Sequence, residues 1–257
     1  YQKGNYLGNA KRMKAGAGVV QMPTVELADG RWMTDTTPMI AWLETQQSEP
    51  TIYPADDALR FLALLIEDYA DEWLWRSAMH YRWTYRRDRL YASEALYTEL
   101  IEGTLRLPRL LALHRLKSRQ RNGFVRGDGV NSATLEHADA TYIAAIDCLQ
   151  AIFEKRRFVL GDTPTIADFG MMAPMFRHFS MDPTPAEIMR SRAPAVYEWV
   201  ARMWNLPPAK GTPNLISAVD DELRALLSEI CETHLAQHRQ NADAFGAQHQ
   251  RFTMQIQ

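Results

Sequence analysis

The spacing of apolar residues separates a short extended segment near the start of the chain from a long helical region. Val25 and Leu27 alternate with other residues over positions 24–28, which is the period-two pattern of a β-strand. Asp29-Gly30 follows, and this dipeptide favours a tight hairpin turn. The pattern therefore predicts a hairpin whose second strand occupies residues 31–34.

A helix is expected to start directly after this hairpin. Asp35 or Thr36 stands at the N-cap position, because a short polar side chain can accept a hydrogen bond from the first N–H groups of a helix. On the other side of the hairpin, Met22-Pro23 precedes the first strand. The apolar face of the predicted helix consists of Met39, Ile40, Trp42 and Leu43.

The rest of the chain shows the period of amphipathic helices. Pro108 and Pro174 lie inside two of the periodic stretches, and each is expected to break or kink its helix because proline lacks an N–H. Phe252, Met254 and Ile256 alternate with polar residues and predict a terminal strand. The predicted helical stretches are residues 57–87, 93–120 and 132–155, a helix after Thr165, a helix from Pro194, and residues 214–248.

Composition is typical of a water-soluble globular protein of one or two domains. The 257 residues are 46% hydrophobic and 23% charged, with a net charge of −2 and a pI near 6.4. This balance lacks the basic surplus of nucleic-acid-binding proteins. No apolar run approaches the roughly 18 residues of a membrane span. Cys148 and Cys231 are far apart, which argues against a disulfide framework and for a reducing, cytoplasmic location.

A second local motif starts a helix in the C-terminal half of the chain. In Thr165-Ile166-Ala167-Asp168, the first and last residues fit a capping box in its aspartate form. The Thr165 hydroxyl would accept a hydrogen bond from the Asp168 N–H, and the Asp168 carboxylate would accept one from the Thr165 N–H. The expected role of both residues is structural.

Residues 67–87 combine aromatic side chains with arginines and acidic residues. Three interpretations fit this composition: a buried helix with a charged surface, the wall of an apolar pocket, or a platform on which single-stranded nucleic acid could stack. The acidic residues at the start of the stretch and the acidic pI argue against the third. The pattern favours the first interpretation, because helices of this kind pack or form interfaces in most folds.

The N-terminal and C-terminal motifs together resemble the glutathione transferase family. In that family Val-Pro precedes a strand and Glu/Gln-Ser precedes a helix, and Met22-Pro23 and Asp35-Thr36 occupy these places. An Ile and a Leu four residues apart follow in the family, where this chain has Met39 and Leu43. The family's C-terminal domain carries a Gly-Asp-x-x-Ser/Thr-x-Ala-Asp motif, which is matched here by Gly161, Asp162, Thr165, Ala167 and Asp168.

The resemblance implies an α/β, thioredoxin-like N-terminal part followed by an all-α C-terminal domain. The expected limits are residues 1–47 for the thioredoxin-like part, 48–57 for a linker, and 58–257 for the helical domain with an extended tail. The family's first domain begins with a β-α-β unit, and no such unit precedes Gln21. The chain is therefore expected to lack this unit and the Ser, Tyr or Cys that activates the thiol.

The resemblance also implies a place for glutathione as the cosubstrate. Pro23 is expected to be cis, which leaves the backbone N–H and C=O of Met22 open to pair with the tripeptide as an added strand. The γ-glutamyl carboxylate would bind the N–H groups of Thr36 and Thr37 at the helix start, and Asp35 would face the γ-glutamyl ammonium. The second substrate would lie against the helix over residues 57–87, where the candidate pocket residues are Trp75, Met79, His80 and Trp83.

The implied activity is transfer of glutathione to a small electrophile through an activated thiolate. The alternative is a non-catalytic binding or assembly module of the same fold, because a fold does not fix a function. A homodimer that uses the helices over residues 36–46 and 57–87 is expected, without nucleic acid or membrane as partners. No metal is expected, because His234 and His238 lie four residues apart but no third ligand follows them at a suitable spacing. A hydrogen-bonded histidine pair is expected instead.

Overall fold

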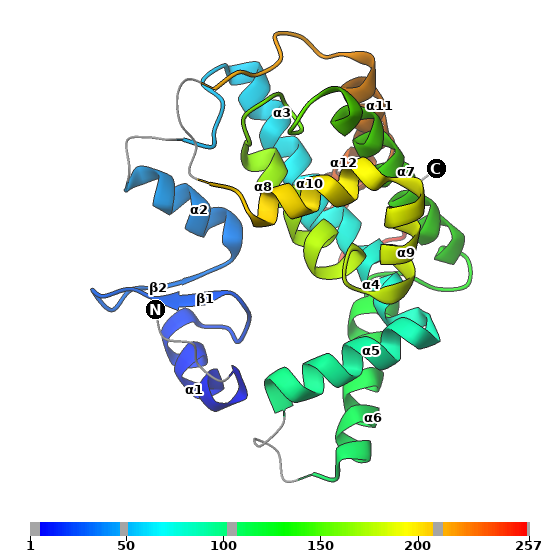
Figure 1. Cartoon of the computed structure of the whole chain (residues 1–257). Helices are drawn as coiled ribbons and strands as arrows, with labels where there is room; N and C mark the ends of the chain where they lie inside the picture. The colour runs from blue at the N-terminus through cyan, green and yellow to red at the C-terminus, as the bar shows by residue number, and fades with distance from the viewer. Residues whose placement is uncertain (1–5, 47–50, 102–106, 208–212, 256–257) are drawn as a thin grey trace. The chain divides into compact units, whose positions relative to one another are not determined.

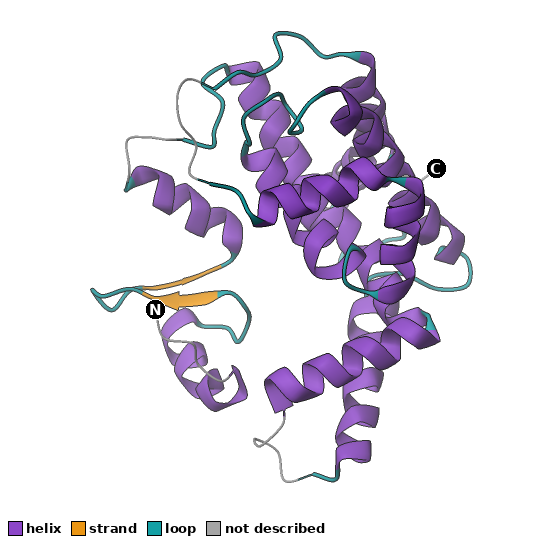
Figure 2. Ribbon diagram, viewed as in Figure 1, coloured by secondary structure: helices purple, strands orange, loops and turns teal. Residues whose placement is uncertain are grey.

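The computed structural model describes residues 6–46, 51–101, 107–207 and 213–255, and helices predominate throughout these ranges (Figures 1 and 2). The chain divides into two compact units: Tyr1–Ile52 with Ala92–Lys117, and Tyr53–Tyr91 with Ser118–Gln257. The first unit ends inside the expected linker, but its second segment comes from the region expected to belong to the helical domain. Within the described residues, no helix is both long and apolar enough to cross a membrane.

The first unit contains the predicted hairpin. Strands β1 (Thr24–Glu26) and β2 (Trp32–Thr34) pair antiparallel, with Thr24 opposite Thr34 and Glu26 opposite Trp32. The turn closes through a hydrogen bond from the Leu27 N–H to the Arg31 carbonyl over 2.8 Å. The hairpin is confirmed, with strands shorter than predicted because the turn takes up residues at both strand ends.

Two helices pack against this hairpin. Helix α1 (Tyr6–Ala17) contacts both strands and buries Met13, and α2 (Thr36–Thr45) contacts β2. A Cβ atom on Gly16 of α1 would lie 2.2 Å from the Trp32 ring, so only glycine permits this close approach. The Arg12 guanidinium forms an ion pair with Glu26 and lies 5.6 Å from the centroid of the Trp32 ring. These contacts attach α1 to the ribbon.

Proline interrupts the second segment of the first unit as predicted. Helix α5 (Arg86–Leu96), which spans the boundary between the units, continues into the π-helical segment η2 (Tyr97–Ile101). Helix α6 (Arg109–Gln120) then begins at the residue after Pro108. The predicted fresh start at this proline is confirmed.

The second unit consists of helices, whose course Figure 1 shows by label. Several of them are separated by π-helical segments, in which one extra residue per turn disturbs the α-helical period. The elements are α3 (Asp57–Asp68), η1 (Tyr69–Trp73), α4 (Leu74–Thr84), η3 (Arg121–Arg126), α7 (Leu135–Lys155), α8 (Ile166–Pro174), η4 (Met175–Phe179), α9 (Pro183–Arg192), α10 (Pro194–Trp204), α11 (Asp221–Glu232) and α12 (His234–Gly246).

Three predicted elements differ from the structure. The helix expected over residues 57–87 changes to π-helix at Tyr69 and ends at Thr84. The helix expected over residues 214–248 starts later, because the Asp220 carboxylate caps α11 through the Leu223 N–H over 3.0 Å, and it breaks at Thr233. The expected terminal strand is absent from residues 251–255, and the last two residues lie outside the described ranges.

Helix α8 lies at the centre of the second unit, where it contacts α3, η1, α4 and α10. The capping box at its start is confirmed. The fully buried carboxylate of Asp168 accepts hydrogen bonds from the Thr165 N–H and the Val159 N–H, each over 2.9 Å, and from Trp199 Nε1 over 3.2 Å. Burial raises the pKa of Asp168 to about 6, although the donors around it favour the ionised form.

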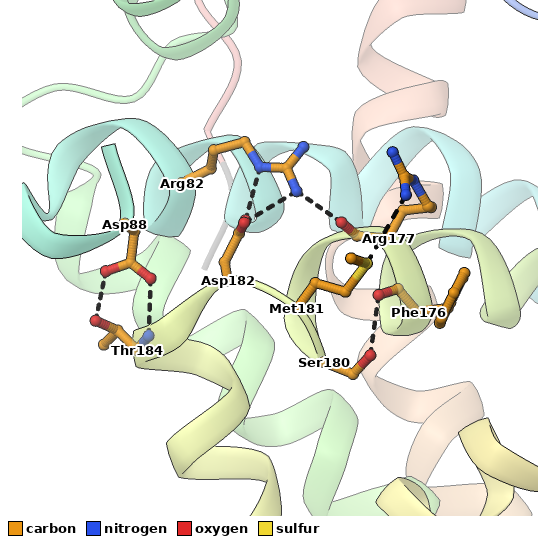
Figure 3. Close-up of polar contacts among 8 residues, drawn as sticks. All are labelled: Arg82, Asp88, Phe176, Arg177, Ser180, Met181, Asp182 and Thr184. Carbon is orange, nitrogen blue, oxygen red and sulfur yellow. Dashed lines mark hydrogen bonds and ion pairs between the residues drawn. The ribbon is translucent and has the colours of Figure 1, made fainter. Parts of the chain in front are cut away.

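Buried charge also fixes α9 (Figure 3). The Arg82 guanidinium donates two hydrogen bonds to the buried Asp182 carboxylate, over 2.7 and 3.0 Å, and one to the Arg177 carbonyl over 2.6 Å. Beside them, the Asp88 carboxylate accepts from the N–H and the hydroxyl of Thr184 in the first turn of α9, the former over 2.7 Å. Asp88 therefore caps a helix that lies about a hundred residues later in the chain.

A backbone clamp joins the loop before α8 to the segment before α11. The Asp162 N–H donates to the Asn214 carbonyl and the Ile216 N–H donates to the Leu160 carbonyl, each over 2.9 Å. Gly161 lies between them with a φ of +147°, and a Cβ atom there would lie 2.4 Å from the Asn214 oxygen. Neither the conformation nor the space permits a side chain at this position.

Asp168→Asn is expected to lower the free energy of unfolding by about 2–4 kcal/mol. An asparagine offers one acceptor oxygen, so its NH₂ group would face two of the buried donors and leave them unpaired. Urea unfolding at pH 7 measures the loss. Asp162→Asn, at an exposed carboxylate in the same loop, is the control and should change stability by less than about 1 kcal/mol. Equal effects of the two substitutions would contradict this role of Asp168.

Gly161→Ala and Gly129→Ala separate crowding from backbone conformation. Both glycines have positive φ, but only Gly161 has backbone atoms where the Cβ would lie; at Gly129 the space is open. We expect Gly161→Ala to destabilise the protein by about 2 kcal/mol or more and Gly129→Ala by about 1 kcal/mol. Thermal unfolding of the two variants tests the clamp. If the clamp is as described, Gly161→Ala must lower the stability more than Gly129→Ala does.

Candidate functional site

The open end of the hairpin brings together the residues predicted to bind glutathione. Because β1 and β2 run antiparallel, the residue before β1 and the residue after β2 lie at the same end of the ribbon. The Thr34 hydroxyl donates to the Pro23 carbonyl over 3.2 Å, which ties the two ends together. Pro23 and Asp35 are therefore neighbours in the first unit.

The Met22-Pro23 peptide bond is cis, as predicted. The carbonyls on either side of Met22 are engaged: the Gln21 carbonyl accepts from the Thr24 hydroxyl over 2.6 Å, and the Pro23 carbonyl accepts from Thr34. Within the described part of the chain, neither the N–H nor the C=O of Met22 forms a hydrogen bond. Met22 is 61% exposed, so the residue lies at the surface, where an extended ligand could reach its backbone.

Asp35 adopts a strained backbone conformation at the start of α2. Its φ of 75° and ψ of 131° lie outside the regions that side-chain-bearing residues ordinarily occupy. Such outliers cluster at binding and catalytic sites, where the surrounding structure maintains the strain. The same residue is the N-cap of α2, because its carboxylate accepts from the Thr37 N–H over 3.1 Å.

The helix start differs in one respect from the expected anion site. The N–H groups of Thr36 and Thr37 were both expected to bind the γ-glutamyl carboxylate, but the Asp35 side chain occupies that of Thr37. The Thr36 N–H has no hydrogen-bond partner among the described residues. The site therefore offers one N–H donor and a carboxylate at the helix start, beside the two backbone groups of Met22. This set suits a peptide that carries both a carboxylate and an ammonium group.

The four candidate residues of the second-substrate pocket lie on α4 in the second unit, and three of them are buried. Met79, His80 and Trp83 are at most 2% exposed. Trp75 is partly exposed and donates from Nε1 to the Asp128 carboxylate over 3.0 Å. These positions assign the three buried residues to the core of this unit, and a pocket formed by the four stays a prediction.

Sequence reasoning missed the polar partner of this helix. His80 Nε2 lies 3.1 Å from the Asp139 carboxylate, and the Tyr85 hydroxyl donates to the same carboxylate over 3.1 Å. Burial lowers the pKa of His80 and raises that of Tyr85 to about 12. Asp139 comes from α7, more than fifty residues away, and no local motif indicates such a pair.

Most of the aromatic rings of this region are buried and do not form a stacking platform. Trp73, Tyr81 and Trp83 are at most 5% exposed, and Arg82 is bound to Asp182. Bases stack on exposed rings, so these rings cannot serve that purpose without unfolding. Of the three interpretations of residues 67–87, a packed helical core describes the structure.

Comparison with known proteins found a family match within the second, helical unit. The family model for the glutathione S-transferase C-terminal domain matches residues 132–202, which include the capping box and the central helix α8. Residues 132–202 thus resemble the C-terminal domain of glutathione S-transferases. The resemblance deduced from the two sequence motifs is thus confirmed for this domain. No curated protein matches the chain.

Two of the solved structures that resemble the chain cover most of its length. The β-etherase LigF from Sphingobium sp. strain SYK-6 is 17% identical, with a TM-score of 0.52 over 87% of this chain and 84% of LigF. A glutathione S-transferase from Rhodospirillum rubrum F11 is also 17% identical, with a TM-score of 0.48 over 77% of this chain and 72% of that protein. The LigF likeness shows the fold, a thioredoxin-like remnant followed by a helical domain.

Asp35→Ala is expected to loosen α2, whereas Asp35→Asn should not. Alanine removes the cap on the Thr37 N–H at a cost of about 1 kcal/mol. Asparagine keeps a capping oxygen and tolerates a positive φ better than alanine does. Amide hydrogen exchange of residues 36–45 should become about fivefold faster in the alanine variant only. Faster exchange in both variants would show that the charge, and not the cap, holds the helix.

Proposed function

We propose that this chain binds glutathione at the open end of the hairpin and transfers it to a small electrophile. The observation that carries the proposal is the backbone of Met22, beside the cis bond to Pro23, which has no hydrogen-bond partner among the described residues. Glutathione is an extended tripeptide, and its cysteinyl N–H and C=O can form a short antiparallel pair with these two groups. The helical glutathione S-transferase domain supports the assignment at the level of the family.

The two ends of the tripeptide require opposite charges in the site. The γ-glutamyl carboxylate would accept from the Thr36 N–H at the positive end of α2. The γ-glutamyl ammonium would donate to the Asp35 carboxylate, which retains acceptor capacity beyond its bond to Thr37. The strained conformation of Asp35 supports this role, because it turns the residue out of the helical path at the ligand-binding end.

The chemistry needs a group that stabilises the glutathione thiolate. The resemblance locates this Ser, Tyr or Cys upstream of Gln21, and the assignment stays a prediction. A thiolate attacks electrophiles where the thiol does not, so a donor to the sulfur lowers the pKa of the thiol and raises the reactive fraction at neutral pH.

A glutathione-binding module without catalysis is the second candidate. It rests on the same Met22 and Asp35 geometry but needs no thiol-activating group and no second substrate. The two candidates agree on binding and differ in turnover, so one set of variants tests the shared site and an activity assay distinguishes the functions.

Calorimetric titration of the full-length gene product with glutathione tests the site. We expect Asp35→Asn to weaken binding by roughly 10- to 100-fold, because a charged hydrogen bond to the ammonium is lost. Thr36→Pro should weaken it by about tenfold, because proline removes the N–H yet suits the first position of a helix. Asp29→Asn, at the far turn of the hairpin, is the control and should bind as the wild type does.

The titration tests the shared site, and a conjugation assay then decides between the candidates. Wild-type affinity in both Asp35→Asn and Thr36→Pro would overturn the glutathione site. If both variants bind more weakly as expected, the wild type is then assayed for conjugation of glutathione to aromatic halides and activated alkenes. Turnover above the rate of free glutathione supports the transferase, and binding without turnover supports the module.

A homodimer is part of the same proposal. Phe61 and Leu64 on α3 leave apolar surface exposed, with Phe61 at 63%, on a helix that the resemblance assigns to the interface. Light scattering should give twice the 29.5 kDa of one chain. Phe61→Glu should give the monomer, whereas Phe245→Glu, at an exposed phenylalanine of α12, should leave the dimer intact. A monomeric wild type would contradict the proposal.

A further inference from the structure

Three metal-ligating side chains meet on the second unit, outside the hairpin site. Asp68 is the last residue of α3, and His234 and His238 lie one turn apart at the start of α12. His234 Nε2 lies 2.6 Å from Asp68 Oδ2, and His238 Nε2 lies 3.2 Å from the same oxygen. The two nitrogens are 3.0 Å apart. The third ligand does not come from α12. It is an aspartate that lies 166 residues before His234 in the chain.

Hydrogen bonds alone cannot satisfy this triangle. An ionised carboxylate oxygen only accepts, so each imidazole nitrogen must carry its proton toward Asp68 to bond with it. Two N–H donors would then face each other across 3.0 Å, with no lone pair between them. If one nitrogen loses its proton and accepts a hydrogen bond from the other, its lone pair then faces the carboxylate oxygen, which is also an acceptor. A single cation in the centre removes the conflict, because all three atoms then act as electron-pair donors.

The dimensions of the triangle suit a tetrahedral divalent cation. Ligand atoms about 2.0–2.1 Å from Zn²⁺ are roughly 3.3 Å apart in a tetrahedron. Two sides of the triangle are within about 0.3 Å of that value, and the third needs about 0.7 Å of opening. The Asp68 side chain is 47% exposed, so it has room to make this adjustment. Two imidazoles and one carboxylate favour zinc over magnesium or calcium, which prefer oxygen ligands.

We propose that Asp68, His234 and His238 form a zinc site that fastens α12 to the end of α3. The partly exposed Asp68 and His238 leave the fourth position to a water molecule from the solvent. The site lies within the second unit and is independent of the proposed glutathione site.

Zinc titration of the tag-free full chain, treated with a chelator and dialysed, tests the site. We expect one Zn²⁺ per chain, bound with micromolar or tighter affinity. His238→Ala and Asp68→Asn should each weaken binding by at least about tenfold. Both side chains are about half exposed, so neither substitution should disturb the core. His249→Ala, at an exposed histidine outside the cluster, is the matched control and should bind as the wild type does.

Thermal unfolding distinguishes this site from adventitious binding of zinc at the surface, which should not raise the Tm. A hundredfold excess of zinc over its dissociation constant should raise the Tm of the wild type and of His249→Ala by about 5 °C or more. It should leave the Tm of His238→Ala and Asp68→Asn nearly unchanged. Equal zinc affinity in wild type and His238→Ala would overturn the proposal, as would wild-type protein that binds no zinc at micromolar concentration. Displacement of zinc by millimolar magnesium would also overturn it.

Discussion

The helical unit depends on one buried carboxylate that must be hydrogen-bonded from several directions. Water is excluded at Asp168, so its charge is tolerated only where protein donors replace hydration. These donors come from the loop at Val159, the helix start at Thr165 and the indole of Trp199 on α10. A shift of any one segment would leave both an unpaired donor and an undersaturated carboxylate. The positions of α8, α10 and the loop are therefore fixed together.

Local geometry could be predicted from the sequence because it depends on neighbouring residues. The Asp29-Gly30 turn, the Asp35 cap, the cis bond before Pro23 and the Thr165–Asp168 box each involve a few consecutive positions. Such motifs also carried the resemblance to glutathione transferases, through two patterns separated by about 130 residues. Two matched patterns constrain the fold far more than either alone, because the probability that both arise by chance is the product of two small probabilities.

Contacts between distant residues could not be read from the same patterns. The pairing of His80 with Asp139 and the convergence of Asp68 on His234 join segments that periodicity treats independently. The π-helical turn at Tyr69 and the break at Thr233 were missed because apolar residues recur at helical spacing on both sides of each position. The hairpin site is thus largely predictable, as is the His234–His238 pair, whereas the approach of Asp68 to that pair is visible only in three dimensions.

The clamp around Gly161 makes the position of α11 independent of the chain that leads to it. Hydrogen bonds on both sides of this glycine attach residues 214–216 to the loop before α8, so α11 starts from a fixed anchor. A change earlier in the chain should therefore displace α11 only after these hydrogen bonds at residues 214–216 have been broken.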